Sequence, residues 1–160
     1  MPTVIILDTG VLSNCVVPLN RGRSTNLSLA EACREWLADC EQNGATILVC
    51  AVAYYEALCE IERRQAVAQR TRLVTYCFQA GRFIPLNTSH LEAPAFLWAQ
   101  ARNVGLTTAN DAALDGDVLL CAQVQSLGFT STDYVVATTN TKHLSRFVNA
   151  DEWQNISPTL

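Results

Sequence analysis

The sequence contains almost no lysine: Lys142 is the only one, and the other ten basic residues of the 160-residue chain are arginines. Acidic residues outnumber basic ones by 15 to 11, which gives a net charge of −4. Broad electrostatic binding of nucleic acid normally needs a basic surface, so this balance argues against it. Five arginines still fall close together, and they either contact phosphates or form ion pairs with nearby glutamates: Arg63, Arg64, Arg70, Arg72 and Arg82.

Long apolar runs are also missing. No run approaches the roughly 20 residues that a membrane-spanning helix needs, and no basic segment of the kind that opens a signal peptide precedes the first apolar run. The seven cysteines are odd in number and include no Cys-x-x-Cys pair, which argues against a disulfide framework and a zinc site. We therefore expect a cytoplasmic protein with no membrane segment, whose cysteines are mostly small buried hydrophobes.

The chain is rich in apolar residues, with 49% hydrophobic and 16% charged content, which excludes a disordered protein. Its length favours a single domain over residues 1–160. Short apolar runs alternate with helical patterns, as in a parallel sheet flanked by helices. Strands are predicted at 4–7, 46–49, 82–86 and 134–137, and helices at 29–43, 51–64 with a continuation or restart to 78, 91–102 and 116–127. This order predicts an α/β domain, and residues from about 148 onward are candidates for a further edge segment of the sheet.

Two carboxylates stand where parallel-sheet proteins place their functional groups. Asp8 directly follows the first strand, at the carboxyl edge where ligands bind in open parallel sheets, although a helix cap is the common alternative there. Glu56 falls on or beside a helical stripe formed by Val52, Tyr55 and Cys59, which we expect to face the core. A buried carboxylate is costly unless it is paired or coordinates a metal, so Glu56 is a candidate functional residue.

A third carboxylate, Asp117, shares a predicted helix face with apolar residues that include Leu120 and Val124. Asp115 lies two positions earlier, so the two side chains diverge on a regular helix. We therefore expect Asp115 to be the N-cap and Asp117 to lie in the first turn, where the helix dipole favours an acid. Asp117 is the stronger candidate for a site.

Small polar residues follow the strand at 134–137. Thr138 and Asn140 either form an ordinary Ser/Thr- or Asx-turn or steady a water or metal ligand. His90 and His143 offer acid-base chemistry without a metal, but no nucleophile accompanies them, so surface or capping roles are the more usual interpretation.

Carboxylates gathered from three separate segments repel one another and need a cation. Oxygen ligands suit Mg²⁺ or Mn²⁺ rather than zinc. Such an ion activates water and stabilises the charge that develops on a phosphate under attack. The residues alone therefore indicate a metal-dependent phosphoryl hydrolase.

Four ordered segments resemble the motifs of PIN-domain nucleases, particularly the toxin-type VapC-like branch: residues 5–13, the apolar helix that bears Glu56, residues 117–122 and residues 137–144. The resemblance runs from near the N-terminus to about Phe147. It implies a three-layer αβα sandwich with a parallel central sheet and Mg²⁺- or Mn²⁺-dependent hydrolysis of RNA. For a toxin-type member it also implies a small antitoxin protein as partner, and a homodimer.

Carried over residue by residue, the resemblance matches Asp8, Glu56 and Asp117 to the family's three core acids. Asn140 falls where many members have a fourth aspartate. Asp115 and Thr138 remain secondary candidates. In the mechanism that this implies, Asp8 and Asp117 hold the metal, Glu56 is a further ligand or orients the attacking water, and Asn140 or Thr138 supports that arrangement.

Other functions stay open at this point. The asparagine in place of a fourth acid, together with the acidic net charge, is compatible with a catalytically weak PIN-like module that binds RNA or protein without cutting. A phosphatase of the haloacid dehalogenase type also begins with an aspartate after its first strand, but it needs a second aspartate where this chain has Gly10. A receiver domain needs an aspartate at the end of a middle strand, and the segment ending at Asn87 supplies none.

Overall fold

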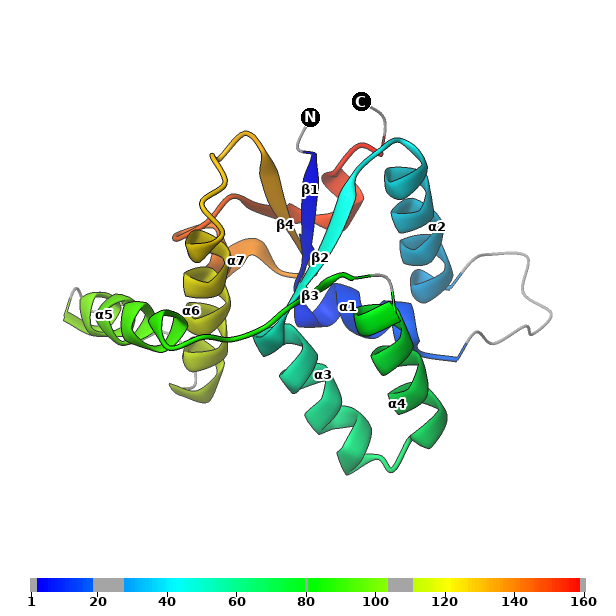
Figure 1. Cartoon of the computed structure of the whole chain (residues 1–160), viewed down its shortest axis with the longest axis horizontal. Helices are drawn as coiled ribbons and strands as arrows, with labels where there is room; N and C mark the ends of the chain where they lie inside the picture. The colour runs from blue at the N-terminus through cyan, green and yellow to red at the C-terminus, as the bar shows by residue number, and fades with distance from the viewer. Residues whose placement is uncertain (1–2, 19–27, 80, 104–110, 159–160) are drawn as a thin grey trace.

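The computed structural model describes residues 3–18, 28–79, 81–103 and 111–158. In this part of the chain a five-stranded, all-parallel sheet forms the centre, with strand order β3-β2-β1-β4-β5 (Figure 1). The strands are β1 (Val4–Leu7), β2 (Thr46–Cys50), β3 (Phe83–Ile84), β4 (Tyr134–Thr138) and β5 (Ala150–Glu152). The unbroken apolar sequence of β1 allows the strand to be buried along its whole length.

Helices connect the strands and cover both faces of the sheet. They are α1 (Thr9–Val16), α2 (Leu29–Gln42), α3 (Ala51–Arg63), α4 (Val67–Val74), the π-helical turn η1 (Thr75–Gln79), α5 (Ser89–Asn103), α6 (Asp111–Ser126), α7 (Thr141–Leu144) and the 3-10 turn η2 (Trp153–Asn155). Among the described residues, every helix is too short or too polar to pass through a lipid bilayer.

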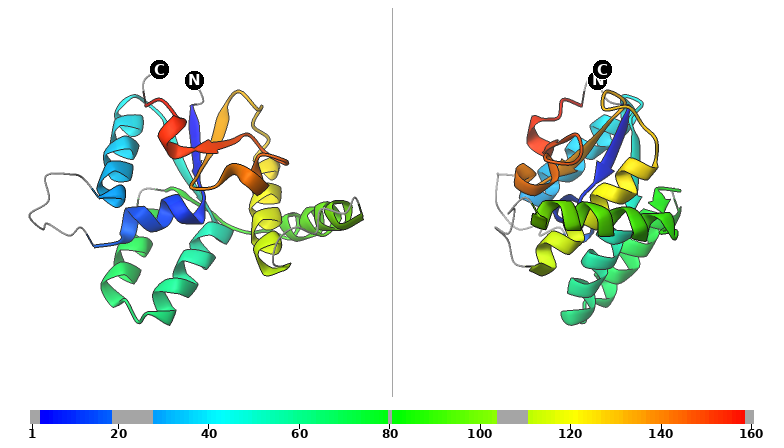
Figure 2. Two further views of the ribbon diagram at one scale, coloured as in Figure 1. Left: turned by 180° about the vertical axis from the view of Figure 1, so that it is seen from behind. Right: turned by 90° about the vertical axis from the view of Figure 1, so that its left-hand side faces the viewer.

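Each face of the sheet has its own hydrophobic core, because successive side chains of a strand point to opposite faces. Ile5 and Leu7 of β1 pack with residues of α1, α2 and α3, whereas Ile6 packs with residues of α6 and α7. The protein is therefore a three-layer αβα sandwich, which confirms the predicted fold class. Helix α5 packs against α6 and extends away from the sheet (Figures 1 and 2).

The register of the sheet brings three strand ends together. Leu7 of β1 lies opposite Val49 of β2 and Ala137 of β4. Helix α1 begins two residues after β1 ends, at Thr9, and α3 follows β2 without a gap, so both helices begin at the same edge of the sheet (Figure 1). This carboxyl edge is where ligands bind in open parallel sheets.

Local sequence signals account for much of this architecture. Ser28 and Glu31 form the predicted capping box at the start of α2, with Glu31 accepting a hydrogen bond from the backbone of Ser28. Gly44 ends that region with a φ of 89°, which favours glycine. All seven cysteines are free thiols, and five of them are buried, as expected; Cys15 is partly buried and Cys59 is exposed.

Two predictions about the helices that carry the acids are wrong. Helix α6 begins at Asp111 rather than Gly116, so Asp115 lies within the helix instead of capping it; Ala112, Ala113 and Leu114 are strong helix formers that extend it. Helix α3 buries Ala53, Ala57 and Ile61, whereas Tyr55 and Cys59 face solvent. Small alanines fit where α3 packs closely against its neighbours, and the large Tyr55 ring does not.

A fully buried glutamine connects three elements of the fold. Gln123 of α6 donates hydrogen bonds through Nε2 to the carbonyl oxygens of Ile84 at 2.7 Å and Pro85 at 3.2 Å. Its Oε1 accepts a hydrogen bond from the backbone nitrogen of Val52 at 3.5 Å. The carboxamide thus joins α6 to the end of β3 and the start of α3.

Replacing Gln123 by alanine is expected to lower the free energy of unfolding by about 2–3 kcal/mol, because buried backbone groups lose their partners and a cavity remains. Urea unfolding followed by circular dichroism measures this change. Gln42→Ala is the matched control: Gln42 is exposed at the end of α2, and its replacement should alter stability by no more than about 0.5 kcal/mol. Equal effects of the two substitutions would contradict this role for Gln123.

Candidate metal centre

Asp8 occupies the carboxyl edge of the sheet as the N-cap of α1. Its Oδ1 accepts a hydrogen bond from the backbone nitrogen of Thr9 at 2.7 Å, and its Oδ2 accepts one from the hydroxyl of Thr138 at 2.7 Å. The backbone nitrogen of Asp8 donates to the carbonyl oxygen of Ala137 at 3.0 Å, which fixes this residue to the end of β4. Both the carboxylate and its backbone are therefore held in place. Asp8 can therefore cap α1 and still be a candidate site residue.

Glu56 extends from α3 into the space between α1 and α6. Its Oε2 accepts a hydrogen bond from the hydroxyl of Thr9. Its Oε1 lies against the backbone of α6 at Gly116, so closely that a β-carbon there would overlap it and would lie 3.2 Å from Cδ. Glu56 is partly buried and lies beside the apolar stripe of α3. The carboxylate group is thus placed by two other helices.

Asp117 follows Gly116 on α6 and is partly buried. Burial, together with the nearby negative charges of Asp8 and Glu56, raises the pKa of Asp117 to about 6. Burial also raises the pKa of Asp8, against the opposing effect of the hydrogen bonds from Thr138 and Thr9. The structure therefore brings Asp8, the N-cap of α1, and Glu56 of α3 close enough to Asp117 of α6 for their negative charges to disfavour its ionised form.

Thr138 and Asn140 have different places at this edge. Thr138 is fully buried at the end of β4; besides contacting Asp8, its hydroxyl accepts a hydrogen bond from the backbone nitrogen of Asn140 at 3.0 Å. Asn140 is exposed and caps α7, with its Oδ1 accepting a hydrogen bond from the backbone nitrogen of Lys142 at 3.1 Å. The Asn140 side chain thus bonds to α7, and its backbone connects to Asp8 through Thr138. The side chain of Asp115 lies outside the described residues.

The two histidines are in different surroundings. His90 is buried: its Nδ1 accepts a hydrogen bond from the backbone nitrogen of Asn87 at 3.1 Å, and its Nε2 lies 2.6 Å from the hydroxyl of Ser126. That hydroxyl donates to the carbonyl oxygen of Gln123, so His90 Nε2 acts as the donor to Ser126. These bonds tie the start of α5 to the end of α6, a structural role. His143 is partly exposed on α7.

Four of the five clustered arginines form ion pairs with acidic residues, and Arg72 donates a hydrogen bond to the carbonyl oxygen of Val16. Arg63 lies 2.7 Å from Glu60, Arg70 lies 2.8 Å from Glu62, and Arg82 lies 2.5 Å from Glu41. The pairs of Arg63 and Arg70 are exposed, and such pairs contribute little to stability. The interpretation as ion pairs is confirmed for these arginines.

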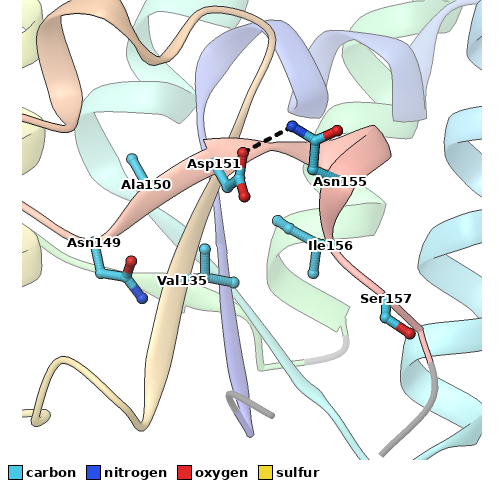
Figure 3. Close-up of a pocket in the computed structure, with 7 residues that line it drawn as sticks. All are labelled: Val135, Asn149, Ala150, Asp151, Asn155, Ile156 and Ser157. Carbon is cyan, nitrogen blue, oxygen red and sulfur yellow. Dashed lines mark hydrogen bonds between the residues drawn. The ribbon is translucent and has the colours of Figure 1, made fainter.

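A separate cavity of about 260 Å³ lies beside β4, β5 and η2 (Figure 3). Its lining is mostly polar, and Asn155 Nδ2 donates a hydrogen bond to Asp151 Oδ1 at 3.0 Å across it. None of the candidate site residues lines this cavity.

The donor set at the carboxyl edge fits a magnesium or manganese ion in its chemistry. Mg²⁺ takes oxygen ligands, retains several waters, and is usually bound through only one or two protein carboxylates. In the part of the chain that the structure describes, no group of three His, Cys, Asp or Glu side chains is gathered tightly enough to enclose an ion. An open site that uses one or two carboxylates is consistent with both observations.

Sequence reasoning did not single out two residues of this arrangement. Thr9 binds Glu56, and Gly116 leaves the space that the Glu56 carboxylate occupies. A hydroxyl residue directly after the strand-end aspartate, and a glycine directly before Asp117, were the available signals.

The five-stranded parallel sheet with helices on both faces is a three-layer α/β fold of the PIN-like type. No family model matches the sequence, and no curated protein matches it. Among solved structures, a chain from the crystal structure of VapBC2 from Rickettsia felis, bound to a DNA fragment from their promoter, has a similar fold. The TM-score is 0.64, the sequence identity is 14%, and the similarity covers 94% of this chain and 98% of that chain.

Proposed function

We propose that this protein is a metal-dependent endoribonuclease that hydrolyses RNA phosphodiester bonds with Mg²⁺ or Mn²⁺. The observation that carries the proposal is the convergence of Asp8, Glu56 and Asp117 at the carboxyl edge, where burial, together with the charges of Asp8 and Glu56, raises the pKa of Asp117 to about 6. Mutual repulsion of this kind costs free energy in the folded protein, and a divalent cation offsets it.

Asp8 and Asp117 would hold the cation. When bound, the cation activates water as a nucleophile and neutralises the charge that develops on the phosphate. The backbone of Thr9 and the hydroxyl of Thr138 orient both oxygens of Asp8, so that the carboxylate needs little rearrangement to bind. Glu56, placed by Thr9 and the α6 backbone, would add negative charge to the site and would serve as a ligand or orient the attacking water. Thr138 supports Asp8 directly, and Asn140 contributes through its backbone.

The structural similarity to VapBC2 also supports a biological role. We propose that the chain is the toxin of a toxin–antitoxin pair, acts in the cytoplasm, pairs with a small antitoxin protein and forms a homodimer. Support for the antitoxin comes from the similar fold of a VapBC2 chain. The homodimer and the RNA substrate rest on the PIN-domain motifs in the sequence.

One observation favours a second candidate, a PIN-like module that binds RNA or protein with little or no cleavage. The side-chain oxygen of Asn140 caps α7 by accepting a hydrogen bond from Lys142, and an asparagine adds no negative charge to the site. A site with three acids binds a second cation less well than a site with four.

The first experiment is RNA cleavage by the purified protein with Mg²⁺ or Mn²⁺, against EDTA, on a panel of tRNA, other structured RNA and single strands. We expect cleavage that stops in EDTA and returns when Mn²⁺ is added in excess. Folded protein that binds the cation but cuts none of these RNAs would favour the binding module. Cleavage that continues unchanged in EDTA would contradict the metal-dependent mechanism.

A further inference from the structure

Gly116 and the carboxylate of Glu56 occupy complementary space. Glu56 comes from α3, yet its Oε1 lies where a side chain at position 116 of α6 would begin. The other oxygen, Oε2, accepts a hydrogen bond from the Thr9 hydroxyl of α1. The carboxylate is therefore confined on one side by a hydrogen bond and on the other by bare backbone.

The backbone conformation of Gly116 does not require glycine. Gly116 lies inside α6, and among the described glycines only Gly44, Gly81 and Gly128 have a positive φ. Glycine weakens the interior of a helix relative to alanine. The close approach of Glu56 is the one structural reason for a glycine here that the described contacts supply.

We propose that Gly116 is a positioning residue for the site: its lack of a side chain lets Glu56 reach the place between Thr9 and α6 from which it acts on the cation. This inference rests on the proposed function. Gly116 does not touch the cation or the RNA itself; it acts through Glu56. A methyl group at position 116 would displace the flexible end of Glu56, so the cost falls on the site rather than on the fold.

The test is Gly116→Ala in the full chain, with Mn²⁺ affinity measured by isothermal titration calorimetry and RNA cleavage measured in parallel. We expect a loss of about 10-fold in Mn²⁺ affinity and about 10- to 100-fold in cleavage, the range typical of residues that orient a metal ligand. The melting temperature without metal should stay the same or rise, because alanine favours the helix. Unchanged affinity and cleavage would overturn the inference.

Gly10→Ala is the matched control. It also adds one methyl group to a helix at the same edge, but that methyl would overlap the hydroxyl of the exposed Thr139 side chain, which must turn aside, instead of a carboxylate. We expect its Mn²⁺ affinity to remain within about twofold of the wild type. An equal loss of affinity in both variants would show that any added methyl group disturbs the edge, and would overturn the specific role of Gly116.

A double-mutant cycle with Glu56→Ala separates positioning from general damage. Without the Glu56 carboxylate there is nothing for the new methyl group to displace, so Gly116→Ala should lower Mn²⁺ affinity no further in that background. Losses that simply add would contradict the inference. If the wild type binds Mn²⁺ and cuts RNA while Gly116→Ala behaves identically, this inference fails alone; if the wild type does neither, the proposed function fails and the inference with it.

Discussion

Replacing Asp8 by asparagine is expected to lower the rate of metal-dependent RNA cleavage by about 100- to 10,000-fold. A metal ion contributes several kcal/mol of transition-state stabilisation, and each 1.36 kcal/mol corresponds to a factor of ten in rate. Asparagine keeps the size of the side chain and can still accept the hydrogen bond from Thr9. It removes the negative charge that the cation needs. Single-turnover cleavage assays at saturating Mn²⁺ measure the effect.

Asp39→Asn is the matched control for this substitution. Asp39 is an exposed residue of α2, and the bonds that it accepts from the backbone nitrogen and the side-chain Nδ2 of Asn43 use its carbonyl oxygen rather than its carboxylate. Removing its charge should leave cleavage within about twofold of the wild type. Cleavage by Asp8→Asn at the wild-type rate, in a preparation free of contaminating nuclease, would exclude Asp8 from the mechanism.

The strands were predictable because a buried strand appears in the sequence as a short, continuous run of apolar residues. A strand covered on both faces is a nearly continuous apolar run, and β1 satisfies this condition over its whole length and β4 up to Ala137. The position of Asp8 followed from the same reasoning, since the residue after such a strand stands at the carboxyl edge. Asp117 could also be predicted from the sequence, because it shares a helix face with the apolar residues Leu120, Cys121 and Val124. All three are buried in the structure.

Close packing between helices was not predictable from periodicity alone. The apolar residues of α3 are spaced so that more than one face of the helix could turn inward. The face that is buried carries the small residues Ala53 and Ala57, and the face with the large Tyr55 ring is exposed. The approach of Glu56 to Gly116 depends on the distance between α3 and α6, which the whole sandwich sets. A hydrogen bond such as that from Thr9 to Glu56 joins residues 47 positions apart. Pairings of this kind are properties of the tertiary structure.

Replacing Asp117 by asparagine should stabilise the metal-free protein and at the same time lower cleavage by about 100-fold or more. The pKa of Asp117 rises from its usual 3.8 to about 6 in the folded protein, mainly because of burial and then because of Asp8 and Glu56. Between these values the folded state binds more protons than the unfolded state, so the stability that Asp117 contributes falls as the pH rises from about 4 to 6. Above pH 6 the ionised Asp117 carboxylate destabilises the folded protein to its full extent. Asparagine carries no charge, so the variant lacks this destabilisation.

Urea unfolding in EDTA at several pH values tests this prediction. The gain in stability of Asp117→Asn over the wild type should be close to zero at pH 4 and reach about 1 kcal/mol at pH 7, a magnitude reduced because Asp117 is only partly buried. Saturating Mn²⁺ should reverse the order, since the cation stabilises only the protein that binds it. A gain that does not change with pH would exclude the carboxylate charge as its cause. A wild type that Mn²⁺ fails to stabilise would show that these three acids do not form a cation site.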